Sequence, residues 1–217
     1  RRNFLRVVGG IGLTSAITPS YLMAQTKETY SNGILIEASS FDSLGGWKLD
    51  TQHFQQMGGA YLLAHGMGEP VENAKTEVKV TAGKWQVWVR NRDWCPGEWK
   101  SPGRFQLLID NKPFEKTLGE GSDQWHWESV GSLEINASKK ITIELQDLTG
   151  FDGRCDAIFL TQDNQPNLPN DNLIDLANWK DHQAGRAELN IQESEFDLVI
   201  VGGGMAGCAA ALAARSQ

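Results

Sequence analysis

Three glycines near the end of the printed sequence have a spacing that suits phosphate binding. Gly202, Gly204 and Gly207 form the pattern G-x-G-x-x-G. In a dinucleotide-binding turn, the first glycine allows the tight turn, the second lets a pyrophosphate approach the backbone, and the third lets the helix pack against the strand. The N–H groups at the start of that helix would hold the phosphates.

The residues around these glycines supply the context that the motif needs. Residues 198–201 read L-V-I-V, which is typical of a strand buried on both faces. The Ala-rich residues 205–215 predict a helix directly after the glycines. The stretch from Phe196 to Gln217 is shorter than the about 30 residues of a complete βαβ unit. We therefore expect only the first half of a nucleotide site, without its ribose-binding acidic residue.

Aromatic residues are the second group of candidates. All of the 8 tryptophans except Trp179 lie between residues 47 and 127. Trp94 and Trp99 occur in the segment D-W-C-P-G-E-W, predicted as a loop, and loops often carry binding residues. Their rings are equally suited to a sugar surface and to packing on a neighbouring domain. Three other tryptophans are predicted to fill the core: Trp85, Trp125 and Trp127.

Other chemistry is only weakly indicated. Asp147, Asp152 and Asp156 could bind calcium, but their spacing does not match a calcium loop, and pairing of Arg154 with one of the aspartates is the favoured interpretation. The sequence lacks H-E-x-x-H, G-x-S-x-G and G-x-x-x-x-G-K-[ST]. We therefore name no metal ligand and no catalytic residue. The 3 cysteines include Cys95 and Cys155, which could form a disulfide or remain free thiols.

The elements that would position these side chains are mostly strands. Apolar and polar residues alternate with period two in several segments, which predicts strands near 34–38, 85–89, 105–109, 141–145 and 157–160. Turn signals separate them at Ala82-Gly83, Asp110-Asn111, Asn136-Ala137-Ser138 and Asp152-Gly153. The predicted fold is mainly β, an antiparallel β-sandwich followed by a truncated Rossmann-type α/β start.

The N-terminal residues look like an export signal. Arg1-Arg2 precede Phe4-Leu5 and a moderately apolar stretch, so residues 1–24 are predicted to be a twin-arginine-type signal peptide. The remaining expected divisions are a linker at 25–32, a sandwich accessory module at 33–162, a linker with a short helix (172–183) at 163–195, and the nucleotide-binding start at 196–217. The predicted location is the periplasm or the outside of a bacterial cell.

Composition excludes some partners. The chain has 20 basic and 27 acidic residues and a formal charge of -7, which is unsuited to general nucleic-acid binding. No stretch of about 18 apolar residues occurs, so no stable membrane span is expected.

Two parts of the chain, the glycine motif and the predicted sandwich, carry a family resemblance. The segment D-L-V-I-V-G-G-G-M-A-G-C-A-A-A resembles the N-terminal FAD-binding stretch of FAD-dependent oxidoreductases. The segments V-R-N-R-D-W-C-P-G-E-W-K-S-P-G-R-F, Q-W-H-W and D-L-T-G-F-D-G-R-C-D-A-I-F-L resemble the sandwich module of secreted bacterial FAD-dependent oxidoreductases, some of them labelled xanthan-lyase-like.

The resemblance implies an exported FAD-dependent oxidoreductase whose flavin takes electrons from an unknown small-molecule or carbohydrate substrate. It implies FAD contacts at Gly202, Gly204, Met205, Ala206 and Gly207, and export through the twin-arginine machinery after the cofactor is loaded. These 217 residues alone would be inactive. One alternative is a non-catalytic carbohydrate-binding or adhesion module, with Trp94 and Trp99 as ligand-binding residues. Another is a polysaccharide lyase or hydrolase activity in the sandwich.

Overall fold

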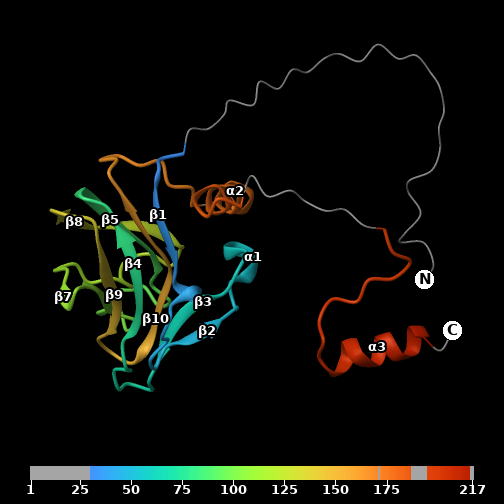
Figure 1. The fold of residues 1–217 in the computed structure, drawn as a ribbon. Helices are drawn as coiled ribbons and strands as arrows, with labels where there is room; N and C mark the ends of the chain where they lie inside the picture. Colours follow the sequence, from blue (N-terminus) through green and yellow to red (C-terminus); the bar gives the residue numbers. More distant parts are fainter. Residues whose placement is uncertain (1–29, 171, 187–194, 216–217) are drawn as a thin grey trace, which may run out of the picture.

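The computed structural model describes residues 30–170, 172–186 and 195–215. The predicted signal peptide at 1–24 lies outside these residues, as does the greater part of the predicted linker at 25–32. Residues 30–170 form two antiparallel sheets packed face to face (Figure 1). The predicted mainly β, antiparallel sandwich is therefore confirmed.

The larger sheet has six strands, with β10 at its centre. Its strands are β1 (Gly33–Glu37), β2 (Lys48–Asp50), β3 (Tyr61–His65), β5 (Gly83–Arg92), β8 (His126–Ile135) and β10 (Phe151–Thr161). The order is β2-β3-β10-β5-β8, and β1 also pairs with β10. One edge of β10 pairs with β5, so β3 and β1 follow one another along its other edge.

The smaller sheet has four strands in the order β4-β9-β6-β7. They are β4 (Ala74–Val80), β6 (Phe105–Ile109), β7 (Lys112–Pro113) and β9 (Lys139–Asp147). The turn between β6 and β7 uses Asp110 and Asn111 at φ values of 50° and 61°, as a tight hairpin requires. Asp152-Gly153 is not the predicted turn, because both residues lie inside β10 at a shift in its register.

The main core lies between the two sheets. It is made by alternate side chains of facing strands, including Val87, Leu107, Ile143 and Ile158, all fully buried. Trp85 belongs to this core, as predicted. Trp125 is also buried in a core cluster, as predicted, but that cluster lies on the outer face of the six-stranded sheet. The prediction was wrong for Trp127, which is only half-buried on the same face.

A helical layer covers part of that outer face. Helix α2 (Leu173–Gln183) matches the helix predicted at 172–183, and Asn172 caps it by accepting from the N–H groups of its first turn. Trp179 is fully buried, with its ring centroid 5.0 Å from that of Phe159 and 5.4 Å from that of Trp127. The short helix α1 (Phe54–Met57) contacts α2 on the same face (Figure 1).

The prediction of a Rossmann-type start was wrong, because its strand is not formed. Residues 198–201 are not a strand, and the side chains of Leu198, Val199 and Val201 are exposed. Helix α3 (Met205–Arg215) is present where the Ala-rich sequence predicts it, but none of its residues is buried. A buried parallel strand needs hydrogen-bonded neighbours, and no other described residue pairs with 198–201. Among the described residues, no helix is both long and apolar enough to cross a membrane.

Candidate binding site

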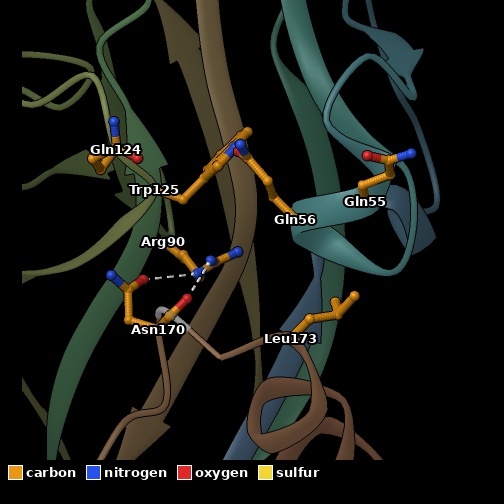
Figure 2. Close-up of a pocket in the computed structure, with 7 residues that line it drawn as sticks. All are labelled: Gln55, Gln56, Arg90, Gln124, Trp125, Asn170 and Leu173. Atoms are coloured by element: carbon orange, nitrogen blue, oxygen red, sulfur yellow. Dashed lines mark hydrogen bonds between the residues drawn. The ribbon is translucent and has the colours of Figure 1, made fainter.

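A polar pocket opens on the outer face of the six-stranded sheet (Figure 2). Its volume is about 260 Å³, near the lower end of the range for small-molecule sites, roughly 300–1,000 Å³. Side chains from α1, β5, the segments just before β8 and α2, and the first residue of α2 line it: Gln55, Gln56, Arg90, Gln124, Trp125, Asn170 and Leu173. Most of these side chains end in an amide, which can both donate and accept hydrogen bonds.

A buried charge cluster forms one wall of the pocket. Arg90 is 1% exposed, and its Nη1 donates to Asp156 Oδ2 at 2.9 Å. Its Nε and Nη2 donate to the side-chain and backbone oxygens of Asn170 (Figure 2). Asp156 also accepts from Lys180 Nζ at 3.0 and 3.1 Å. The cluster therefore ties α2 and the segment before it to the sheet.

A second polar group lies beside the pocket on the same face. The Tyr61 hydroxyl donates to Asp50 Oδ2 at 2.5 Å. Burial, together with this hydrogen bond, raises the pKa of Tyr61 to about 12. Burial and the nearby charges of Arg92 and Arg154 lower the pKa of His53. His53 is therefore neutral at pH 7 and has a ring nitrogen that can accept from Arg92 Nη1, 3.0 Å away.

Trp94 and Trp99 lie in the loop between β5 and β6, as predicted, and both rings are exposed, by 38% and 59%. Trp94 Nε1 donates to the carbonyl of Phe151 at 3.1 Å, and Trp99 Nε1 donates to that of Cys95 at 2.9 Å. A side chain at Gly97 would collide with the Trp99 ring, since its Cβ would lie 2.4 Å from a ring carbon. Contacts with β10 and within the loop therefore hold the two indoles in place and leave ring surface in solvent.

The three aspartates considered for calcium have separate partners. Asp147 accepts from backbone N–H groups of Val71, Thr149 and Gly150, and Asp152 pairs with His65, whereas Asp156 belongs to the buried charge cluster. The favoured pairing of Arg154 with an aspartate carboxylate is not found, because its Nη1 donates to the backbone carbonyl of Asp152. The thiols of Cys95 and Cys155 are free.

The glycine motif forms a tight turn. Gly202 has a φ of 104°, and a Cβ at Gly207 would lie 2.0 Å from the carbonyl oxygen of Gly202. The turn thus fits the shape of a phosphate-binding loop, but the described residues add neither a neighbouring strand nor a residue for the ribose. FAD binding stays a prediction for these residues: Gly202, Gly204, Met205, Ala206 and Gly207.

Glu128 on β8 is held by three hydrogen-bonding groups at the edge of the sheet. Lys116 Nζ lies 2.9 Å from one carboxylate oxygen, and Asn91 Nδ2 and His126 Nε2 lie 3.2 and 3.7 Å from the other. Burial alone would raise the pKa of Glu128, but the hydrogen bonds from His126, Lys116 and Asn91 outweigh it and lower the pKa to about 2. The carboxylate therefore stabilises the fold above its unfolded pKa of 4.5.

We expect Glu128→Gln to lower the free energy of unfolding by about 1–2 kcal/mol at pH 7. The difference from the parent protein should shrink as the pH falls from 4.5 towards 2, where the carboxylate becomes protonated. Urea unfolding at several pH values measures this, with the exposed Glu134→Gln on the same strand as the control. A difference that does not change with pH would assign the effect to packing.

Comparisons with known proteins concern the sandwich. No family model matches the chain, and no curated protein matches it. The GH26-CBM35 β-(1,4)-mannanase of Podospora anserina is 18% identical, with a TM-score of 0.48, over 64% of this chain and 29% of the mannanase. The CBM36-1 domain of a multidomain xylanase from the hindgut metagenome of Trinervitermes trinervoides is 14% identical, with a TM-score of 0.47, over 62% of this chain and 100% of that domain. A family 35 carbohydrate-binding module from Clostridium thermocellum is 12% identical, with a TM-score of 0.43, over 60% of this chain and 98% of the module.

These findings correct the expected family and activity. The solved structures with a similar fold are carbohydrate-binding modules and glycoside hydrolases, and no oxidoreductase or FAD-binding protein appears among them. The interpretation as an FAD-dependent oxidoreductase was therefore wrong. Its physical basis was local, a glycine turn before an Ala-rich helix, and the described residues do not build the parallel sheet that such an enzyme requires.

Proposed function

We propose that this chain contains a non-catalytic carbohydrate-binding module, with Trp94 and Trp99 as its sugar-binding surface. The observation that carries the proposal is that these two indole rings are exposed and held in place, whereas the other six tryptophans are buried or half-buried. Exposed aromatic surface is unfavourable in water unless a ligand covers it. The ring N–H groups already donate to backbone carbonyls, that of Trp94 to Phe151 on β10 and that of Trp99 to Cys95, so only the exposed surface of each ring is free for a ligand. A flat ring face suits the apolar face of a sugar.

The polar pocket would complete the binding surface. Arg90 lines the pocket, and Trp94 follows four residues later, which places the two within about 14 Å along the chain. The amide groups of Gln55, Gln56 and Gln124 can donate to and accept from sugar hydroxyls. A polysaccharide chain could thus contact aromatic rings at one point and amide groups at another. This module would act outside the cytoplasm, and the predicted signal at 1–24 would deliver it through the twin-arginine machinery.

The test is binding of the whole chain to a panel of soluble polysaccharides, by affinity electrophoresis and then by calorimetry. Replacing both Trp94 and Trp99 with alanine should weaken binding by about tenfold or more, since tryptophans in contact with a ligand often contribute over about 2 kcal/mol. Phe196→Ala is the matched control, because that ring is 69% exposed and lies outside the sandwich. Its binding should equal that of the parent protein.

Two results would count against the proposal. If the double variant keeps its fold, shown by circular dichroism, and binds as tightly as the parent, the loop tryptophans are not the sugar surface. If the folded parent protein binds none of the polysaccharides, the proposed function itself is wrong.

A further inference from the structure

Two arginines face one another beside Trp94 on the outer face of the six-stranded sheet. Arg92 on β5 and Arg154 on β10 are direct cross-strand partners in the register of the sheet. Like charges placed opposite one another destabilise a strand pair. The Arg154 guanidinium carbon also lies 5.8 Å from the centroid of the Trp94 ring. A pair of positive charges thus borders one of the exposed tryptophans.

Neither arginine has a counter-charge in contact. Among the described residues, no carboxylate lies within 4.0 Å of the Arg92 or Arg154 guanidinium. Arg154 is only 6% exposed, and the Nε atoms of both arginines are buried without a hydrogen-bond partner. Arg90, on the same face, instead contacts Asp156 at 2.9 Å. Burying a charge without a partner is costly, so the unpaired arginines require an explanation.

The carboxylates around the two arginines lie beyond contact distance. Asp50 attracts Arg154 electrostatically but does not contact it, and its Oδ2 accepts from the Tyr61 hydroxyl. Asp123 acts on Arg92 only from beyond contact distance. His53, which touches Arg92, is neutral at pH 7. No carboxylate in the described part of the chain therefore forms a direct ion pair with either guanidinium, which leaves room for one from a ligand.

We propose that Arg92 and Arg154 bind the carboxylate of a uronic acid unit in an acidic polysaccharide, next to a sugar that stacks on Trp94. This inference rests on the proposed carbohydrate-binding function and specifies its ligand. Guanidinium groups suit a carboxylate because their planar N–H groups can donate two parallel hydrogen bonds. The whole chain has a charge of -7 and would repel a polyanion elsewhere. An acidic polysaccharide would therefore bind at Arg92 and Arg154.

The first test changes the ligand and leaves the protein intact. Binding of the whole chain to oligomers of polygalacturonate is compared with binding to their methyl esters, which keep the sugar ring and lack the charge. We expect the free acid to bind about tenfold or more tightly, since hydrogen bonds to charged groups contribute about 1.5–3 kcal/mol. The difference should shrink as sodium chloride is added, because salt screens partly exposed charges.

The second test changes the protein. Arg92→Gln is preferred over a change at Arg154, because Arg92 is only half-buried and its loss is better tolerated. The variant should lose the preference for the free acid and keep its affinity for the methyl ester. Lys112→Gln, an exposed basic residue on β7 of the other sheet, should change neither.

The outcomes separate the two proposals. Equal binding of the acid and the ester would overturn the carboxylate site and leave carbohydrate binding in place. A preference for the acid that survives Arg92→Gln would also overturn it. Equally tight binding of a sulfated neutral polysaccharide would overturn the assignment to a carboxylate. If no glycan of any charge binds to the folded chain, the proposed carbohydrate-binding function is itself wrong.

Discussion

Replacing Asp156 with asparagine should lower the free energy of unfolding by about 3–5 kcal/mol, the cost typical of removing one partner from a buried ion pair. Asp156 is 2% exposed and is the shared partner of Arg90, which is 1% exposed, and Lys180, which is 7% exposed. Without the carboxylate, two positive charges would stay buried close together. The amide can accept a hydrogen bond, but it cannot supply the negative charge.

Urea unfolding of the parent and variant proteins at pH 7 measures the loss. Asp181→Asn is the matched control, because Asp181 pairs with Arg186 on the surface, where both side chains are about half exposed. We expect that change to cost less than about 1 kcal/mol. Combining Asp156→Asn with Lys180→Met should recover part of the stability, since one of the two uncompensated charges is removed.

A small effect of Asp156→Asn would contradict this account. A loss below about 1 kcal/mol would mean that other groups compensate the charges of Arg90 and Lys180. Asn170 already accepts two hydrogen bonds from Arg90, and Glu37 lies 3.9 Å from Lys180. The ion pairs of Asp156 would then contribute little to the free energy of unfolding.

The sandwich could be predicted because its strands follow a simple rule. Side chains of a strand alternate between two faces, so a strand with one buried face shows a period of two in its sequence. This worked for β5 and β9, where core and surface residues alternate. It worked less well for β10, whose residues from Gly153 to Thr161 are all buried. Both faces of this central strand are covered, so the contrast between buried and exposed positions does not reveal its register.

The burial of the tryptophans could not be assigned to a face from the sequence. Residue type predicts that Trp125 and Trp127 are buried or half-buried, but the outer face of the six-stranded sheet is also covered, partly by α2. The helix itself was predictable, yet nothing local showed where it packs. The charge cluster was missed for the same reason: Arg90 and Asp156 are 66 residues apart, and only the fold brings them together.

The glycine motif shows the opposite error, where a strong local pattern was given too much weight. The turn at Gly202 and the helix after it form as expected. A dinucleotide fold, however, depends on hydrogen bonds between parallel strands, and these are contacts that no short segment can specify. The exposed tryptophans were identified correctly as loop residues, because Pro96 and Gly97 mark a turn. The unpaired arginines gave no signal, because a missing partner is visible only in three dimensions.

Replacing Trp179 with alanine should lower the free energy of unfolding by about 3–5 kcal/mol, the range for truncating a large buried aromatic residue. Trp179 is fully buried between Phe159 and Trp127, and its ring packs α2 against the sheet. The smaller side chain would leave a cavity under the helix. Because α2 begins at the pocket residue Leu173, soon after Asn170, its loosening should also weaken glycan binding.

Trp99→Ala is the matched control for stability, since it removes the same side chain from a site where the ring is 59% exposed. That variant should unfold within about 0.5 kcal/mol of the parent protein, as surface substitutions usually do. The two variants should therefore differ in opposite ways. Trp179→Ala should mainly lower the free energy of unfolding, and Trp99→Ala should weaken glycan binding alone. A Trp179→Ala protein that keeps the parent's stability would show that the sheet folds independently of α2. The pocket residues Asn170 and Leu173 would then be held by the Arg90–Asp156–Lys180 cluster and not by the Trp179 contact.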